Sequence, residues 1–214
     1  MMSTNPTQPR AKRRDAASNN ERLIQAARAV FARRGLSATL EEVAQHAGVG
    51  VGTVYRNFAS KQQIVETLYS EAIESALADV QSALEIEDPW LAIVEFFEVT
   101  AANQARDRGL YETFLAHDAL GPDEHVTTRL VAVLSPLFER ASAAGVLRRG
   151  ITVTDTGPIF AMLNAIYGMS PAHPDLWRRY LSILLDGLRA NDRPALAVPA
   201  LDVAAFSQAL GSTG

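Results

Sequence analysis

Helical periodicity along almost the whole chain is the feature that most constrains its fold. Apolar residues recur every three or four positions, which is the spacing of an amphipathic helix rather than of a strand. Residues 150–153 alone have β-branched character, and because they lie between two helical patterns we expect a loop there. A chain built from amphipathic helices buries their apolar faces against one another. We therefore predict an all-α protein.

Three short helices are predicted near the N-terminus. The first carries a single apolar stripe over residues 23–31. The second begins at Thr39, because Thr39 and Glu42 have the spacing of a capping box, in which the two side chains bond to each other's backbone amides. This second helix stops at Gly48, and a third follows over about residues 51–58.

The second and third helices have the spacing of a helix-turn-helix motif. A turn of three to four residues separates them, and its Gly48 readily adopts the positive φ that such a turn requires. Val49, Val54 and Phe58 are expected to face the core of the three helices. The positions left facing outward are Val51, Thr53, Tyr55, Arg56 and Asn57.

The chemistry of these outward side chains suits double-stranded DNA. Threonine and tyrosine hydroxyls can donate to phosphate oxygens, which sets the register of a protein on the duplex. In the major groove, arginine pairs with guanine and asparagine with adenine, while Val51 can meet a thymine methyl group. Lys61 begins the next predicted helix, where its charge and the free backbone amides both attract a phosphate.

The charge distribution points to the same end of the chain. Residues 1–62 hold ten Lys/Arg and four Asp/Glu, a net charge of +6, whereas residues 63–214 carry −10. A basic head on an acidic body can bind a polyanion through that head although the whole chain is acidic. Chance segregation of solvated charge is the alternative explanation.

Six further helices are predicted after these three. Residues 60–63 form a second capping box, and Asp88 followed by Pro89 has the form of an N-cap with proline at the first helical position. The six helices span about residues 60–84, 88–107, 109–117, 122–144, 155–169 and 174–190. Residues 191–214 are low in charge, so we expect a mobile end with one helical turn near residues 203–210.

The last two predicted helices have long apolar faces. Two helices on a single domain rarely need so many large residues on more than one face, so pairing with a second copy of the chain is one explanation. Completion of the core within one subunit is the other. The predicted interface residues are Ile159, Met162, Leu163, Ile166, Trp177, Leu181, Leu184, Leu185 and Leu188.

Residues 23–69 resemble the DNA-binding domain of the TetR family of transcriptional regulators. The resemblance rests on the segments Thr39–Ala44, Ala47–Val49, Gly52–Phe58 and Ser60–Lys61, with Ala26, Ala27, Phe31 and Gly35 before them. In that family the residues matching Thr53, Tyr55, Asn57 and Lys61 commonly contact DNA, and we add Thr39, Val51 and Arg56 as candidates. The chain departs from the family at Gly50, where many members have serine, and at Val51, where many have a polar side chain.

The remainder of the chain resembles the C-terminal domain of a subgroup called SbtR-like. The matching segments are Asp88–Trp90, Gln104–Leu110, Ala144–Arg148, Trp177–Tyr180 and Leu185–Leu188. This resemblance implies a pocket between the middle helices that takes a small-molecule effector, with no cofactor. Candidate pocket residues are Phe97, Asn103, Phe114, His117, Asn164 and Tyr167, each of which is alternatively an ordinary core residue.

The expected organisation is a helix-turn-helix domain followed by a six-helix regulatory and dimerisation domain. The segments are a disordered basic arm over residues 1–18, the DNA-binding domain over 19–66, the ligand-sensing and dimerising domain over 67–190 and a tail over 191–214. The resemblance implies a homodimeric repressor that binds a palindromic operator and is released by the effector. With no export signal or membrane span, the cytoplasm is the expected compartment.

Two other classes of protein compete with this interpretation. An enzyme is disfavoured, because the glycines at positions 48, 50 and 52 follow a helix, whereas a phosphate-binding loop follows a strand. The sequence Asp123-Glu124-His125 could touch a metal, but a solvated helix N-terminus explains it better, and without cysteine a thiolate metal site is impossible. A helical adaptor that binds only proteins would explain the helices but not the basic head.

Overall fold

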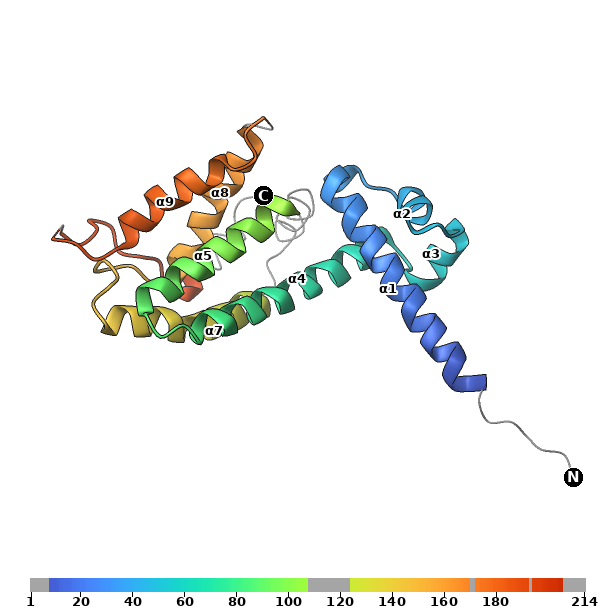
Figure 1. Ribbon diagram of the computed structural model, residues 1–214, viewed down its shortest axis with the longest axis horizontal. Helices are drawn as coiled ribbons and strands as arrows, with labels where there is room; N and C mark the ends of the chain where they lie inside the picture. Colours follow the sequence, from blue (N-terminus) through green and yellow to red (C-terminus); the bar gives the residue numbers. More distant parts are fainter. Residues whose placement is uncertain (1–7, 108–123, 170–171, 193, 206–214) are drawn as a thin grey trace, which may run out of the picture. The chain divides into compact units, whose positions relative to one another are not determined.

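The computed structural model describes residues 8–107, 124–169, 172–192 and 194–205 (Figure 1). Every named element in these ranges is a helix, so the all-α prediction is confirmed. Extended backbone pairs in these ranges only at a single antiparallel bridge between Leu147 and Arg189. None of the described helices combines the length and the apolar character that crossing a bilayer requires.

The chain divides into two compact units, whose border lies within one helix at Ser70 and Glu71. The first unit contains α1 (Gln8–Arg34), a 3₁₀ turn (Gly35–Ser37), α2 (Leu40–Ala47), α3 (Val51–Asn57) and the start of α4 (Lys61–Leu84). The second contains the rest of α4, α5 (Pro89–Arg106), α7 (Glu124–Ala143), a 3₁₀ turn (Val153–Asp155), α8 (Thr156–Met169) and α9 (Leu176–Leu188). The predicted helix over residues 109–117 lies outside the described residues.

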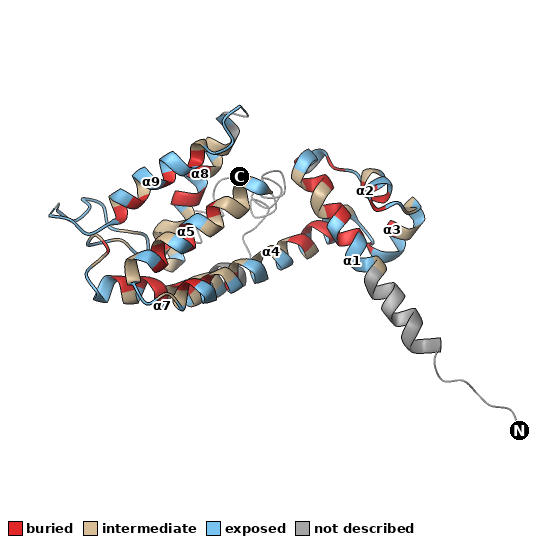
Figure 2. Ribbon diagram, viewed as in Figure 1, coloured by how far each residue is buried: buried red, intermediate tan, exposed pale blue. Residues whose placement is uncertain are grey.

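The core of the first unit is formed by all four of its helices. Phe31 of α1, Val43 of α2 and Val54 of α3 are fully buried, together with Ile64 and Leu68 from the start of α4. These residues follow the apolar stripes of the sequence, and Figure 2 shows buried segments of the helices in red. The first two turns of α4 therefore belong structurally to the helix-turn-helix unit.

α1 begins earlier than the sequence predicted. The expected disordered arm over residues 1–18 is wrong from Gln8 onward, because the helix already begins there. Between Gln8 and Arg34 the only strong helix breaker is Pro9, and proline is tolerated in the first turn, where its missing amide has no helical partner. Alanine, lysine and arginine, which favour helices, dominate residues 10–17.

Aromatic rings from three helices form the centre of the second unit. The Phe97 ring of α5 lies 5.4 Å from Phe160 of α8 and 6.5 Å from Phe138 of α7, measured between centroids. Phe96 meets Phe160 edge to face at 5.9 Å. Such arrangements are the preferred geometry of aromatic pairs. They fix α5, α7 and α8 around one apolar core.

The chain after α9 is bound to the second unit rather than mobile as far as it is described. The Arg148 guanidinium donates to the Pro194 carbonyl oxygen at 2.9 Å. Farther along, the hydroxyl of the buried Thr154 donates to the Leu201 carbonyl oxygen at 2.8 Å. The prediction of a mobile end is therefore wrong for residues 194–201, because their carbonyl groups find donors on the loop between α7 and α8.

Candidate nucleic-acid interface and ligand site

The start of α2 has the predicted capping box. The Thr39 hydroxyl oxygen accepts from the Glu42 backbone amide at 3.2 Å, and the Glu42 carboxylate accepts from the Thr39 amide at 3.0 Å. Arg34 Nε lies 3.3 Å from the same carboxylate and ties α1 to it. Because Thr39 uses its oxygen as an acceptor, its hydroxyl proton stays available for an outside acceptor such as a phosphate.

The turn between α2 and α3 depends on Gly48. This residue has φ +69° and its amide donates to the Ala44 carbonyl, which ends α2 in the left-handed conformation that favours glycine. Gly50 is the N-cap of α3 and, lacking a side chain, leaves the cap without a side-chain hydrogen bond. The helix-turn-helix spacing is confirmed, and so is the absence of the capping hydroxyl at position 50.

α3 has one face in the core and one face open to solvent. Val54 is fully buried, and Phe58, which caps the helix, is nearly so. On the other side the Tyr55 side chain is 52% exposed, and Arg56 and Asn57 are exposed beside it. Val51 and Thr53 are partly covered. All five outward positions predicted for this helix therefore lie away from its fully buried face.

The polar side chains of α3 are held against their own helix. Arg56 Nε donates to the Gly52 carbonyl at 3.1 Å, and Arg56 Nη2 lies 3.1 Å from the Thr53 hydroxyl. The Asn57 carboxamide donates to the Thr53 carbonyl at 2.7 Å. These contacts restrict the Arg56 and Asn57 side chains, while the remaining guanidinium N–H groups of Arg56 can still donate to a partner.

The start of α4 differs from the predicted capping box in one contact. The Ser60 hydroxyl accepts from the Gln63 backbone amide at 3.1 Å, as expected. The Gln63 side-chain oxygen, however, accepts from the backbone amide of Ala59, one residue before the cap, at 2.7 Å. Lys61 follows the cap with its Nζ 5.7 Å from the centre of the Phe31 ring. Lys61 is therefore placed over the apolar core at the first turn of α4.

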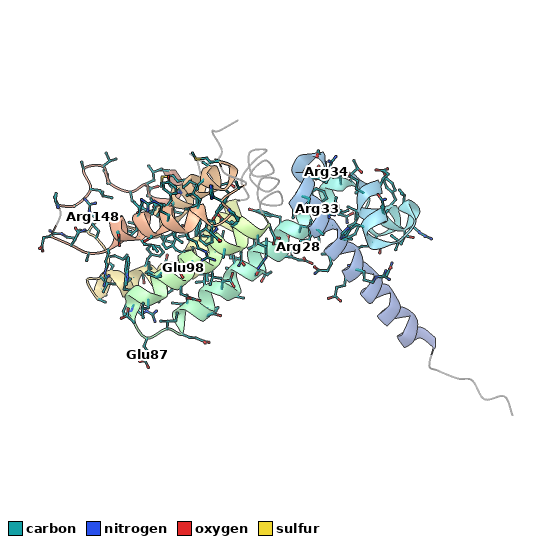
Figure 3. All side chains as sticks on the ribbon, turned by 45° about the horizontal axis from the view of Figure 1, so that its top comes forward. Arg28, Arg33, Arg34, Glu87, Glu98 and Arg148 are labelled. Atoms are coloured by element: carbon teal, nitrogen blue, oxygen red, sulfur yellow. The ribbon has the colours of Figure 1, made fainter. Side chains whose placement is uncertain are left out.

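Three arginines of α1 contact α2 in ways that the helical pattern did not indicate. Arg22 donates to the Ala47 carbonyl at 3.1 Å, at the C-terminal end of α2 where carbonyl groups have no helical partner. Arg33 lies 3.3 Å from His46 Nδ1, and Arg34 pairs with Glu42; Figure 3 labels Arg33 and Arg34 at the end of α1. Part of the positive charge in this unit thus stabilises the unit itself.

The predicted ligand residues lie at different places in the second unit. Phe97 is fully buried in its aromatic core, and the Tyr167 hydroxyl donates to the Ala101 carbonyl at 2.9 Å. Asn103 donates to the Asp79 carboxylate at 2.9 Å, which ties α5 to α4. Burial raises the pKa of Asp79, and the Asn103 hydrogen bond and the Arg106 charge oppose that rise only in part. Phe114 and His117 lie outside the described residues.

Asn164 is the predicted ligand residue with an unsatisfied polar atom. Its Oδ1 is buried and has no hydrogen-bond partner among the described residues. Thr100 Oγ1 and Gln104 Oε1 of α5 share this property, and sequence reasoning missed both. Their positions were the available signal. Thr100 follows the predicted pocket residue Phe97 by three positions, and Gln104 follows the buried Ala101 by three, on a mainly apolar helix.

An open groove of about 220 Å³ lies elsewhere, between α5 and α9. Trp90 and Trp177 line it, and each indole ring carries an arginine: Arg178 lies 4.4 Å from the Trp177 ring and Arg189 5.2 Å from the Trp90 ring. None of the predicted ligand residues lines this groove. Because arginine side chains already cover both indole rings, this groove is not the pocket that we expected between the middle helices.

Most of the residues predicted for a dimer interface lie inside the second unit. The buried ones are Ile159, Leu163, Trp177, Leu181, Leu185 and Leu188, whereas Ile166 and Leu184 are half-buried. For these six the assignment to an interface needs correction, because their side chains already pack in the core of one subunit. Among the nine, only Met162 is exposed, and it shares that exposure with Met169, Tyr180 and Ile183.

Metal-binding side chains do not gather in groups of three or more in the part of the chain that the structure describes. The side chains of Asp123, Glu124 and His125 fall outside that part.

Two family models match the chain in succession. Residues 23–68 match the model described as bacterial regulatory proteins, tetR family. Residues 88–190 match the model described as the C-terminal domain of SbtR-like transcriptional regulators. Together these segments cover well over half of the sequence, and the first of them contains α2, α3 and the start of α4.

Individual transcriptional regulators are also similar to this chain. The HTH-type transcriptional regulator SrpR of Pseudomonas putida is 26% identical over 183 residues, covering 85% of this chain and 80% of that protein. The HTH-type transcriptional repressor KstR2 of Mycolicibacterium smegmatis is 35% identical over 81 residues, 37% of this chain and 36% of that protein. A crystal structure of a TetR transcriptional regulator from Streptomyces coelicolor superposes with a TM-score of 0.61 at 29% identity, covering 80% of this chain and 99% of that one.

Proposed function

Because the chain belongs to the TetR family of bacterial transcriptional regulators, with an SbtR-like C-terminal domain, we propose that it is a repressor of a palindromic operator. It binds that operator as a homodimer through α3, and a small molecule bound in the second unit releases it. The protein is a DNA-binding regulator and not an enzyme. The operator symmetry, the release by an effector and the residues named below are the proposal.

The observation that carries the proposal is the open face of α3. A seven-residue helix with a buried Val54 exposes Tyr55, Arg56 and Asn57 side by side. Hydroxyl, guanidinium and carboxamide groups are those that contact phosphates and base edges. We assign Thr39, Thr53, Tyr55 and Lys61 to phosphates, and Arg56 and Asn57 to bases, with Val51 meeting a thymine methyl group.

Homodimerisation accounts for the exposed apolar side chains of the last two helices. Met162 and Met169 on α8, and Tyr180 and Ile183 on α9, would otherwise face water. In a two-fold interface each such patch meets its own copy, and the two recognition helices then lie one DNA turn, about 34–36 Å, apart. We therefore assign the interface to this exposed face, with Ile166 and Leu184 at its edge.

Effector release requires a site that communicates with DNA binding. The buried, unsatisfied side chains between α5 and α8 are the supporting observation, and Phe97, Tyr167 and Asn103 lie on the same two helices. A ligand that binds the other conformation better lowers operator affinity, with a coupling of typically about 1–3 kcal/mol.

The test is to select bound fragments from the parent genome with the full-length protein and to measure affinity by fluorescence anisotropy. We expect a two-fold symmetric sequence bound at least about 10³-fold more tightly than unrelated DNA. Equal affinity for all sequences, or no binding at 50 mM salt, would reject the repressor and leave the helical adaptor.

A further inference from the structure

Three buried oxygen atoms on facing helices are the strongest unexplained feature of the second unit. Thr100 Oγ1 and Gln104 Oε1 belong to α5, and Asn164 Oδ1 belongs to α8. None has a hydrogen-bond partner among the described residues. A buried polar atom left unpaired destabilises a fold, and such atoms are rare in native proteins unless a bound molecule pairs with them.

Two contacts show how α5 and α8 lie against each other. The rings of Phe97 and Phe160 are 5.4 Å apart between centroids. One turn farther along α5 and about two turns farther along α8, the Tyr167 hydroxyl donates to the Ala101 carbonyl oxygen at 2.9 Å. The two helices are thus in contact over at least this stretch, and Figure 1 draws them crossing within the same unit.

The unsatisfied oxygens belong to this stretch. Asn164 lies between Phe160 and Tyr167 on α8, and Thr100 lies between Phe97 and Ala101 on α5. Gln104 follows Thr100 by one helical turn. Polar acceptors therefore border the aromatic contact of α5 with α8, which gives a ligand an apolar ring environment on one side and hydrogen-bond acceptors on the other.

The charge of the surroundings limits the kind of ligand. α8 contains no Asp, Glu, Lys, Arg or His from Thr156 to Met169. On α5, Glu98 is exposed and lines the groove toward α9, while Arg106 and Asp107 pair with each other at 3.8 Å. Asp79 of α4 already accepts from Asn103. Arg140 of α7 has a buried Nε and Nη2 without partners in the described part of the chain and donates through Nη1 to the Leu84 carbonyl oxygen at the end of α4. Beside α8, a charged ligand would lose its hydration without gaining an opposite charge from that helix, which is unfavourable.

We propose that the effector is an uncharged ring compound that donates hydrogen bonds to Thr100, Gln104 and Asn164. This inference rests on the effector site of the proposed function and adds the chemical class of its ligand. Because the Phe97 and Phe160 rings touch each other, the compound enters by separating them. It therefore binds better to a conformation in which α5 and α8 have moved apart, which is the condition for a ligand to shift a conformational equilibrium.

The experiment compares four small ring compounds on the full-length protein by ligand-observed NMR titration. Phenol and toluene have the same number of heavy atoms and differ in the hydrogen-bond donor, whereas benzoate and benzylammonium add a negative or a positive charge. We expect phenol to bind at least about fivefold more tightly than toluene, the value of one hydrogen bond. Benzoate and benzylammonium should bind more weakly than both.

A double variant tests which residues are responsible. Thr100→Val with Asn164→Leu replaces two unsatisfied polar groups by apolar groups of similar size, so the protein should unfold at an equal or higher temperature. Its preference for phenol over toluene should fall clearly below that of the native protein, because Gln104 is then the one proposed acceptor left. Gln81→Leu, which makes a comparable amide-to-leucine change on the exposed surface of α4, should keep the preference of the native protein.

The possible outcomes separate the two proposals. Equal affinity for phenol and toluene, or tighter binding of benzoate, overturns the ligand class while an effector site remains. If none of the four compounds binds while operator binding is intact, the site itself is rejected, because water or other parts of the chain then satisfy these oxygens. Loss of operator binding in the native protein would instead reject the proposed function. A double variant that keeps the full native preference for phenol overturns the assignment of Thr100 and Asn164 as acceptors.

Discussion

At the residue scale, Gly48 and Gly50 look alike in the sequence but have opposite requirements. A Cβ atom added to either would meet nothing within 4 Å, so space does not distinguish them. Their backbones do: Gly48 has φ +69°, whereas Gly50 has φ −71°, which any residue adopts. Only the first position needs glycine.

We expect Gly50→Ser to stabilise the protein by about 0.5–1 kcal/mol. Serine adds a capping oxygen to α3 and reduces the freedom of the unfolded chain. The matched change Gly48→Ser should destabilise by about 1–2 kcal/mol, because it places a side chain in the left-handed region. Urea unfolding of each variant checks this: the midpoint should shift while the slope of the free energy of unfolding against urea stays unchanged. Equal shifts of both variants would contradict the assignment.

Tyr55 and Arg56 are expected to affect DNA binding in different ways. Tyr55→Phe removes a hydroxyl assigned to a phosphate, so affinity should fall about equally for all sequences. Arg56→Ala should reduce the free energy of operator binding by about 1–3 kcal/mol and relax specificity at one base pair. Anisotropy against an operator and its single-base variants distinguishes these patterns, with Gln62→Ala as a surface control. A uniform loss for Arg56→Ala would make it a phosphate contact.

At the element scale, helix ends were the most predictable features. The capping box at Thr39 and the N-cap at Asp88 could be predicted from the sequence, because a capping side chain and its backbone partner are only two or three residues apart. The helix from Lys61 to Leu84 was predicted almost to the residue. The N-terminal start of α1 was not, because basic polar residues suit a solvated helix and a disordered arm equally well.

The faces of the last two helices were less predictable than their ends. Trp177, Leu181 and Leu188 are large and regularly spaced whether they face the core or a partner, so the pattern alone could not separate the two. Their burial within one subunit decides it. The positions of Thr100 and Gln104 on an apolar helix were visible in the sequence, but their lack of hydrogen-bond partners was not, since that depends on residues distant in sequence.

The Asp79–Asn103 contact between α4 and α5 should make stability depend on pH. Because burial raises the pKa of Asp79, this residue favours folding at pH values below its ordinary pKa of 3.8 and opposes it once pH exceeds the folded pKa. Asp79→Asn should therefore be more stable than the native protein at pH 7, with a difference that vanishes toward pH 3.

Denaturant titrations at several pH values check this expectation. Asp79→Ala is the control, because it removes the carboxylate together with the acceptor for Asn103 and should not gain the same stability at pH 7. If the native protein is as stable as Asp79→Asn at pH 7 or more stable, the prediction is wrong, and the folded protein stabilises the ionised Asp79 carboxylate.

The exposed face of α8 and α9 carries the prediction for the dimer. Ile183→Glu should give a folded monomer with weakened binding to a full palindrome, because a carboxylate in a two-fold interface occurs twice and is costly to bury. Leu91→Glu is the matched control, since Leu91 is 55% exposed and Ile183 54%, and it should stay dimeric. Light scattering gives the mass. An Ile183→Glu dimer would place the interface elsewhere.

At the scale of the whole molecule, the division of charge predicts how DNA binding responds to salt. The basic head releases condensed counterions when it covers phosphates, while the acidic remainder of the chain cannot contribute. With roughly 6–10 phosphate contacts per dimer, affinity should fall by about 10³–10⁵ between 50 and 200 mM salt. Anisotropy at a series of salt concentrations measures the slope. A flat response would reject phosphate neutralisation by this head.

The two tryptophans have a further consequence for the molecule as a whole. Trp90 and Trp177 are the only tryptophans of the chain, and both lie in the second unit beneath arginine side chains. The DNA-binding unit contains tyrosine but no tryptophan, so light at 295 nm excites only the second unit. Its intrinsic fluorescence therefore distinguishes the melting of one half from the other, and it lets an effector be detected optically while the operator is bound, without any added dye.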